Sequence, residues 1–430
     1  MKSGGWLLLV LSFVSAPGQG AELPEPVIPA GVGVNIHFVT GHGSDLDRIA
    51  AAGFKFVRMD FQWSDTERQK GEYTWKGYEE LLKNLDDRGL RALFILDYSN
   101  PLYEETVTSP HPITQALHRT TASPQHPESV AAFARWAGAA AKHFRGRHVI
   151  WEIWNEPNGH FWSPKPDATQ YCALAVSACQ AVRAGDPKAT VVGPASSGFP
   201  WDFLETVLKS GVLDCLDAVS VHPYRDRRNP PETAATDYEK LRRLIDRYTP
   251  AGKAGLPILS GEWGYSTHSK GVTLETQGAF AARQQLANLL AGVPLSIWYD
   301  WKNDGPDANE NEHNFGTVLP DLSPKPAYVA IQTLTRELGG YRVVRRVPLA
   351  NAKDYLLLCV NGAGEQKLAA WTLDDTHAVT IELPNSPDQI TAVNVSGGKI
   401  DLQQRAGRLE LELGPGPLYA GIGKRAVPGK

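Results

Sequence analysis

Cysteine is scarce in this sequence, with four residues in 430. Cys172 and Cys179 are seven positions apart on a predicted helix, about 10 Å along its axis, which is beyond disulfide reach. A bridge from Cys215 to either of them stays open, but we expect buried free thiols at these positions and at Cys359. Because the cysteines and histidines also lack the spacing of a metal site, we predict no bound metal.

An excess of charge of one sign is also lacking, since the formal net charge is -4. Without a basic face, we do not expect nucleic acid as a partner. No stretch is long and apolar enough to span a membrane. Residues 1–20 combine an early lysine, a short apolar run and small residues, as a secretory signal peptide does. We therefore expect a secreted or periplasmic protein, with an uncleaved N-terminal tail as the alternative.

Short apolar runs alternate with amphipathic segments from residue 31 onwards. Runs such as residues 92–96 are almost continuously apolar, as the internal strands of a parallel sheet are. Strand and helix patterns alternate eight times, which predicts a (β/α)8 TIM barrel over residues 21–338. One connection, residues 99–127, is predicted to be a long loop without regular structure, of the kind that is usually functional.

The pattern changes after residue 338. Short alternating runs are separated there by Gly, Asn, Asp and Pro, which predicts a small antiparallel, sandwich-like β domain over residues 339–430. The expected organisation is therefore a signal peptide, a barrel and a C-terminal β domain.

Two glutamates lie at the ends of predicted strands. Glu156 is part of WEIWNEPN, residues 151–158, where a proline stops the strand, and Glu262 is part of ILSGEWG, residues 258–264. Functional groups of a TIM barrel lie at the carboxyl ends of its strands. A pair of carboxylates there is what retaining glycoside hydrolysis requires. The alternative for each glutamate is a structural role, as a helix cap or in an ion pair.

Both segments resemble motifs of clan A glycoside hydrolases, especially of families five and thirty-nine. The motifs are Asn-Glu-Pro and Glu-Trp-Gly, and the resemblance runs from about residue 31 to residue 338. It implies a retaining β-glycoside hydrolase that acts on a polysaccharide or oligosaccharide without a cofactor, with Glu156 as acid/base and Glu262 as nucleophile. The alternative is a non-catalytic glycan-binding barrel involved in polysaccharide export or matrix assembly.

Strand alternation predicts the neighbours of the two glutamates. Counting in twos places Glu152 and Trp154 on the face of Glu156, and Ser260 on the face of Glu262. A carboxyl group that donates a proton and later takes one back needs a raised pKa. We therefore expect the pKa of Glu156 to lie well above that of a free glutamate, helped by desolvation from aromatic neighbours.

The second predicted strand directs Arg58 into the barrel, where a buried guanidinium needs an anionic partner. We expect Glu262 to be that partner, and Asp60 or Glu152 are the alternatives. The resemblance further implies a set of substrate-side residues. They are Asn155 at the sugar, His222 and Tyr224 beside the two glutamates, and Trp298 or Trp301 as the floor of the sugar site. The last choice stays open, because two residues three apart lie on opposite strand faces.

The sequence departs from family five at the end of the third strand. A histidine is common there in that family, whereas this chain has Asp97. We expect Asp97 to bond a sugar hydroxyl and His37, on the first strand, to take the space of the missing histidine. Family-five specificity is therefore not carried over.

Overall fold

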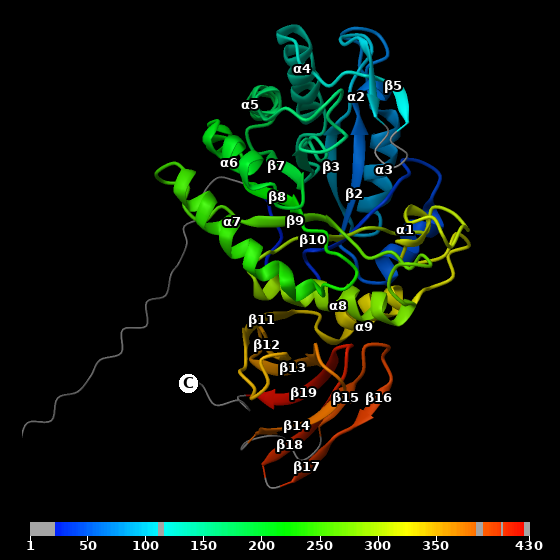
Figure 1. The fold of residues 1–430 in the computed structure, drawn as a ribbon, viewed down its shortest axis with the longest axis vertical. Coiled ribbons are helices and arrows are strands. Elements are labelled where there is room, and N and C mark those ends of the chain that lie inside the picture. Colours follow the sequence, from blue (N-terminus) through cyan, green and yellow to red (C-terminus); the bar gives the residue numbers. More distant parts are fainter. Residues whose placement is uncertain (1–21, 111–115, 384–389, 406, 425–430) are drawn as a thin grey trace, which may run out of the picture.

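The computed structural model describes residues 22–110, 116–383, 390–405 and 407–424. Figure 1 shows a barrel wrapped by helices and, beyond α8 and α9, a C-terminal β module. The predicted signal peptide lies outside the described residues. Within these ranges, no helix has the length and apolar character that a membrane crossing would need.

Eight parallel strands close the barrel in the order β1-β10-β9-β8-β7-β6-β3-β2, and β1 pairs with both β10 and β2. The strands are β1 (Val32–Asn35), β2 (Phe56–Gln62), β3 (Arg91–Asp97), β6 (Ile150–Ile153), β7 (Thr190–Ser197), β8 (Ala218–His222), β9 (Ile258–Trp263) and β10 (Ser296–Trp298). The predicted TIM barrel is confirmed.

Helices cover the outside of the barrel (Figure 1). They are α1 (Gly43–Ala51), α2 (Trp63–Thr66), α3 (Lys76–Asp86), α4 (Pro127–His143), α5 (Ala168–Gly185), α6 (Trp201–Lys209), α7 (Ala234–Tyr248), α8 (Leu274–Leu290) and α9 (Pro326–Glu337), with the short 3-10 turns η1 (Val212–Asp214), η2 (Pro231–Thr233) and η3 (Glu312–Asn314). The start of α5 follows from its sequence, because the Asp167 carboxylate accepts the N–H groups of Thr169 and Gln170.

Side chains alternate along β2 as predicted. Val57, Met59 and Phe61 belong to the core between strands and helices, whereas Phe56 belongs to a separate apolar cluster inside the barrel. That inner cluster is Phe56, Leu93, Ile95, Ile150, Val192, Ala218, Leu259, Leu295 and Ile297. Arg58 is the next inward residue of β2 and is 1% exposed. The inner apolar cluster therefore packs below Arg58, whose charge is buried nearer the carboxyl ends of the strands.

The connection after β3 corrects one prediction. Residues 99–127 contain an antiparallel hairpin of β4 (Thr106–Pro110) and β5 (Leu117–Thr121). The hairpin is closed at its base by a hydrogen bond from the Ala122 N–H to the Glu105 carbonyl. Thr106 and Thr108 of β4 and the adjacent Thr120 and Thr121 of β5 supply β propensity that the Pro and His content of the segment obscures.

The cysteines correct a second prediction. Cys179 and Cys215 form a disulfide with a Cα–Cα distance of 6.1 Å, and Cys172 and Cys359 are free and buried. The alternative bridge from Cys215 is therefore the one present. It joins α5 to the end of η1, a contact between distant segments that spacing along one helix does not reveal.

The C-terminal module consists of two antiparallel sheets with apolar side chains between them. One sheet contains β11 (Tyr341–Arg346), β12 (Asp354–Asn361), β13 (Glu365–Thr372), β19 (Leu418–Lys424), β15 (Thr391–Val393) and β16 (Lys399–Asp401), and the other contains β14 (His377–Glu382), β18 (Arg408–Leu413) and β17 (Gln403–Arg405). In β18, Leu409, Leu411 and Leu413 are buried and the residues between them are exposed. This alternation confirms the sandwich-like prediction.

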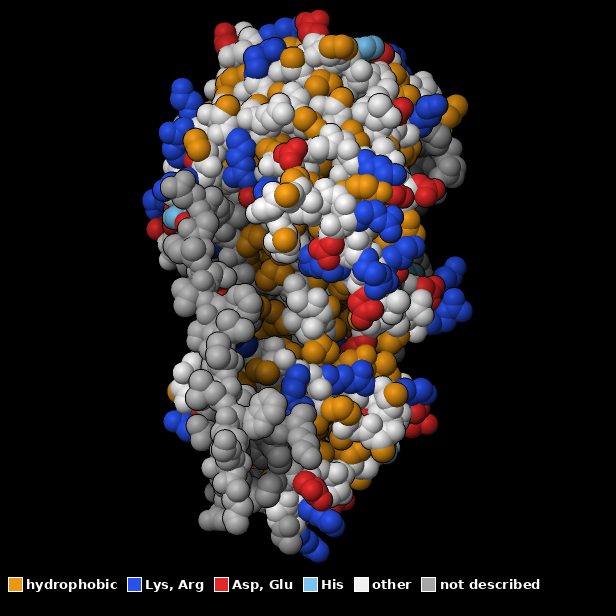
Figure 2. Space-filling model, turned by 90° about the vertical axis from the view of Figure 1, so that its left-hand side faces the viewer, with side chains coloured by type: hydrophobic (Ala, Val, Ile, Leu, Met, Phe, Trp, Pro, Cys, Tyr) orange, Lys and Arg blue, Asp and Glu red, His pale blue; other side chains and the backbone are white. Residues whose placement is uncertain are grey.

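A buried polar network joins the module to the barrel. Arg283 of α8 donates from Nε and Nη2 to the Glu232 carboxylate at 2.8 and 2.7 Å, and from Nη1 to the Pro415 carbonyl at 3.0 Å. The Trp371 indole of β13 donates to the same carboxylate at 2.8 Å. Beside this network lies a groove of about 520 Å³, and Figure 2, which views this side, shows hydrophobic side chains in the hollow between the two parts.

The network predicts that the two parts unfold together. Replacing Arg283 by Met leaves the Glu232 charge buried without its cation, which costs about 3–5 kcal/mol of unfolding free energy. We expect Arg283→Met to lower the midpoint of a single denaturation transition. The exposed pair Lys83–Asp87 provides the control, and Lys83→Met should leave the midpoint unchanged. A separate early transition of the module alone, with the barrel intact, would contradict the prediction.

Candidate active site

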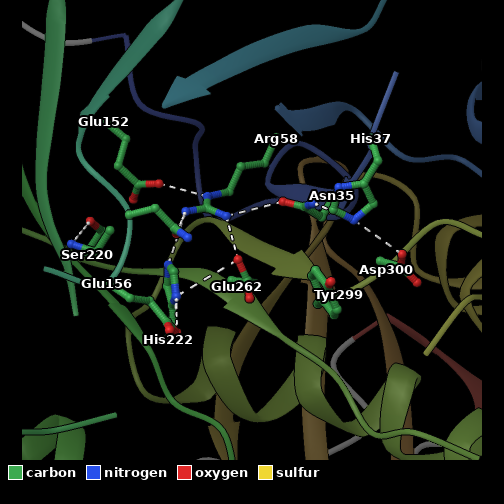
Figure 3. Close-up of polar contacts among 12 residues, drawn as sticks. Asn35, His37, Arg58, Glu152, Glu156, Ser220, His222, Glu262, Tyr299 and Asp300 are labelled. Atoms are coloured by element: carbon green, nitrogen blue, oxygen red, sulfur yellow. Dashed lines mark hydrogen bonds and ion pairs between the residues drawn. The ribbon is translucent and has the colours of Figure 1, made fainter. Parts of the chain in front are cut away.

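Arg58 lies at the centre of a polar cluster at the carboxyl ends of the strands (Figure 3). Its guanidinium contacts five groups: Glu152 Oε2 at 2.7 Å, Glu262 Oε2 at 2.6 Å, Asn35 Oδ1 at 3.2 Å, Asn155 Oδ1 at 2.8 Å and His222 Nε2 at 3.2 Å. A guanidinium has five N–H donors, so all of them have a partner. Burial lowers the pKa of Arg58, but the charges of Glu152 and Glu262 outweigh it and raise the pKa. Arg58 is therefore bound both by its expected partner, Glu262, and by the alternative partner, Glu152.

The contact with Arg58 determines how His222 hydrogen-bonds. Because the guanidinium can only donate, His222 Nε2 accepts and the ring proton lies on Nδ1. Nδ1 then donates to Glu156 Oε1 at 2.9 Å. The imidazole therefore links Arg58 to Glu156.

Left-handed backbone positions turn the end of β6 towards this cluster. Trp154 has φ 67° and Glu156 has φ 45°, and the Glu156 N–H donates to the Ala195 carbonyl at 3.0 Å. These values break strand alternation, so Asn155 contacts Arg58 while Trp154 is fully buried in the outer core. The prediction that Trp154 shares the face of Glu156 is therefore wrong. Such strained positions are typical of functional sites.

The pKa of Glu156 differs in direction from the prediction. Burial raises it, but the hydrogen bond and charge interaction with His222 outweigh burial, so the pKa lies below its ordinary value. The Glu156 side chain is 12% exposed. In the ligand-free protein the ionised form of Glu156 is thus the favoured one.

Glu262 accepts two hydrogen bonds at the end of β9, from Arg58 to Oε2 and from the Tyr224 hydroxyl to Oε1 at 2.8 Å. One oxygen of Glu262, one oxygen of Glu156 and a ring nitrogen of His222 all lie within 4.8 Å of one another. Burial and the charge of Glu262 raise the pKa of Tyr224 well above its ordinary value, so its hydroxyl remains a donor. The structure therefore brings the two predicted carboxylates together.

An irregularity in β9 directs Glu262 inward. Ser260 pairs with Ser296 and Trp263 pairs with Trp298, so three steps along β9 match two along β10. A Cβ on Gly261 would lie 3.0 Å from Glu152 Oε1, which shows that Gly261 also faces the cluster. The prediction that Ser260 shares the face of Glu262 is wrong, because the extra residue shifts the alternation.

Tyr299 lies at this site, and neither of the two predicted tryptophans does. Trp298 and Trp301 are at most 1% exposed and pack in the outer core, where the Trp301 indole donates to Asp45 at 2.9 Å. The Tyr299 ring centroid lies 5.7 Å from that of His37 and 6.4 Å from that of Tyr224. The prediction of Trp298 or Trp301 as the floor does not fit the structure, because β10 ends at Trp298 and the next residue turns inward.

His37 lies at the edge of the same cluster with its side chain 44% exposed. Its Nε2 is 3.5 Å from Asp300 Oδ2 and 3.4 Å from the Asn35 amide nitrogen. Burial lowers the pKa of His37, but the hydrogen bond and charge of Asp300 raise it to about 9. Burial also raises the pKa of Asp300. His37 is therefore a cationic, accessible side chain beside Tyr299 (Figure 3).

Asp97 does not reach the site. It is 0% exposed, and its carboxyl group lies against that of Asp60. Burial and the nearby charge of Asp60 raise its pKa well above the ordinary value. The prediction that Asp97 bonds a sugar hydroxyl does not fit, because strand β3 directs it beneath the surface.

Sequence reasoning missed Asn35, Tyr299 and Asp300. All three follow or end a barrel strand on the side where functional groups gather, and that rule was the signal available for them. The cluster of Glu156, His222 and Glu262 has donor types that could hold a metal ion. Arg58 already supplies a cation in contact with two of the three, so we assign no metal there.

Comparisons with solved structures agree with this fold. A family 39 glycoside hydrolase from the gut symbiont Bacteroides cellulosilyticus WH2 is 25% identical, with a TM-score of 0.77, 91% of this chain covered and 80% of that one. A family 39 enzyme from Xanthomonas axonopodis pv. citri is 16% identical, with a TM-score of 0.66 and coverages of 92% and 94%. A family 39 β-xylosidase from Caulobacter crescentus is 17% identical, with a TM-score of 0.66 and coverages of 94% and 98%.

The search of curated proteins finds no match. Residues 26–305, more than half of the chain, match the family model described as cellulase, glycosyl hydrolase family 5. The chain therefore belongs to the cellulase family, glycosyl hydrolase family 5, and has the barrel shared by clan A glycoside hydrolases.

Proposed function

We propose that the protein is a retaining β-glycoside hydrolase that cleaves a polysaccharide or oligosaccharide by double displacement. The observation that carries the proposal is that carboxylate oxygens of Glu156 and Glu262 lie within 4.8 Å of each other. Retaining enzymes place their carboxyl groups about 5–5.5 Å apart, and inverting enzymes leave roughly 6.5–9.5 Å for a water molecule. The short separation favours covalent attack on the sugar.

Glu262 is the proposed nucleophile. Its two oxygens accept from a guanidinium and from a hydroxyl, which stabilise the negative charge and fix the direction of the carboxylate. When Glu262 forms the glycosyl ester it loses that charge, and Arg58 keeps its ion pair with Glu152. The cation is thus never left buried without a counter-charge.

Glu156 is the proposed acid/base. Its Oε1 accepts from His222, so Oε2 is the oxygen that would carry the transferred proton. It would protonate the leaving oxygen and then take a proton from the attacking water. Because the pKa of Glu156 is lowered in the ligand-free protein, the protonated form needed for the first step becomes more abundant as the pH falls.

We also propose that the protein is secreted or periplasmic. The signal-like residues 1–20 support this. The Cys179–Cys215 disulfide adds support, because disulfides persist mainly in oxidising compartments.

The roles of the two glutamates predict different rescue products. Glu262→Ala should abolish turnover on aryl β-glycosides, and azide should restore it with formation of the α-glycosyl azide. Glu156→Ala should lose about 10²–10⁴-fold in rate, least with activated leaving groups, and azide should give the β-glycosyl azide. The screen begins with cellooligosaccharides, xylooligosaccharides and the matching aryl glycosides, because the family model is a cellulase and one structural neighbour is a β-xylosidase.

Glu80→Ala, at an exposed position of α3, is the control and should behave like the wild type. Wild-type rates in Glu262→Ala on every cleaved glycoside would refute the nucleophile assignment. Glycan binding without cleavage that depends on either glutamate would instead favour a non-catalytic glycan-binding barrel.

The His222 contact predicts the pH profile. Its N–H stabilises ionised Glu156 and so lowers that pKa; removing it must raise the pKa. We expect His222→Ala to move the alkaline limb of kcat/KM to higher pH, because that limb reports loss of the protonated acid. His222→Asn, whose amide can still donate to Glu156, should keep the limb close to the wild-type position. A downward or absent shift in His222→Ala would contradict this reading.

Tyr299 predicts which aromatic side chain contacts the sugar. Tyr299→Ala should lower kcat/KM roughly tenfold, because an aromatic contact contributes about 0.5–1.5 kcal/mol beyond its buried area. Tyr299→Phe keeps the ring and should retain most activity. Trp301→Phe should leave kinetics unchanged and lower stability by about 1 kcal/mol, through loss of the bond to Asp45. A larger loss of kcat/KM in Trp301→Phe than in Tyr299→Ala would instead support Trp301 as the floor of the sugar site.

A further inference from the structure

A second group of metal-ligating side chains lies at the base of the β4–β5 hairpin, outside the site described above. Glu104 and Glu105 immediately precede β4, and His126 precedes α4, shortly after β5. One ligand atom from each of the three lies within 4.8 Å of the other two. The group therefore joins both ends of the hairpin segment that follows β3.

Glu104 is buried and held in one orientation. Its Oε1 accepts hydrogen bonds from the Ser129 hydroxyl, from the Gln125 N–H at 2.8 Å and from the His126 N–H at 3.2 Å. The other oxygen, Oε2, is inaccessible and has no hydrogen-bond partner in the part of the chain that the structure describes. The Glu104 side chain is 0% exposed. The three hydrogen bonds to Oε1 therefore hold the carboxyl group so that its unbonded Oε2 faces His126 and Glu105. Supporting hydrogen bonds orient the ligands of metal sites in the same way.

The distances within the group fit a shared ion better than direct hydrogen bonds. His126 Nε2 is 3.6 Å from Glu104 Oε2 and 3.4 Å from Glu105 Oε2. A charge-assisted N–H···O bond would be about 2.7–2.9 Å long. Two ligand atoms on one tetrahedral Zn²⁺, with bonds of about 2.0–2.2 Å, lie roughly 3.3–3.6 Å apart. His143 at the end of α4 and Glu79 of α3 show the ordinary geometry, with 2.7 Å between Nε2 and Oε1.

The donor types narrow the ion. Two carboxylates and one imidazole bring a charge of -2, which a divalent cation neutralises. An imidazole nitrogen favours Zn²⁺ and neighbouring transition metals over Ca²⁺ and Mg²⁺, which prefer oxygen ligands. His126 and Glu105 are 56% and 58% exposed, so an ion can enter from solvent and keep water as its remaining ligand.

We propose that Glu104, Glu105 and His126 form a structural site for a divalent transition-metal ion, with Zn²⁺ as the probe. The ion would tie the start of β4 to the start of α4 and so fix the base of the hairpin. This inference does not depend on the proposed glycosidase activity, because none of the three residues touches the Arg58 cluster.

The test is zinc binding at pH 8, where an ordinary imidazole is neutral and a histidine–carboxylate ion pair is weak. Equilibrium dialysis followed by metal analysis should give one equivalent of Zn²⁺ more in the wild type than in His126→Gln. The wild type should also gain several degrees in melting temperature on adding Zn²⁺, and this gain should disappear in His126→Gln and in Glu104→Gln. Any zinc held by Glu156, His222 and Glu262 is common to all these proteins and cancels in the difference.

His143→Gln is the matched control, because it removes a histidine of α4 that pairs with a carboxylate, that of Glu79 on α3. It should bind zinc and respond to it like the wild type. His126 is exposed, so His126→Gln should fold even where the buried Glu104→Gln does not. Equal zinc stoichiometry and equal thermal response in the wild type and His126→Gln would overturn the proposal.

Discussion

One buried guanidinium fixes the geometry at the strand ends. A fully desolvated Arg58 is tolerable only if every N–H finds an acceptor and the charge is balanced nearby. Glu152 and Glu262 supply the charge, and Asn35, Asn155 and His222 take the remaining hydrogens. Since these partners end or directly follow four different strands, β1, β6, β8 and β9, satisfying Arg58 also fixes how those strands are placed around it. Moving any of these partners would leave a buried N–H of Arg58 without an acceptor. The energetic cost of that loss keeps the site from relaxing.

Regular strands alone would not produce this arrangement. The cluster needs Asn155 and Glu156 to face inward in succession, which the left-handed φ values at Trp154 and Glu156 allow. It also needs Gly261 and Glu262 to do so, which the irregular pairing of β9 with β10 allows. The absent side chain of Gly261 leaves room for Glu152. The two carboxylates therefore meet because both strands depart from regular geometry at their tips.

These departures mark what the sequence could and could not predict. Hydrophobic patterning predicted the barrel, the inward direction of Arg58 and the glutamates at strand ends, because each depends on local periodicity. It failed at Trp154 and Ser260, where counting in twos crosses a left-handed residue or an extra residue. The tryptophan floor, Trp298 or Trp301, was implied by the family resemblance, and the strand ends before the residue that turns inward. The Cys179–Cys215 bridge depends on packing between distant segments, and no local pattern carries that information.

Two carboxylates within 4.8 Å of each other need unequal surroundings to perform different steps. Glu262 accepts from a cation and a hydroxyl, whereas Glu156 accepts from the N–H of an imidazole that itself accepts from the same cation. Arg58 therefore acts directly on one carboxylate and indirectly, through His222, on the other. A bound sugar would exclude water from Glu156 and add to the burial effect that already opposes His222. Glu262 keeps its direct ion pair with Arg58, so Glu156 is the carboxylate whose burial by substrate favours the uptake of a proton.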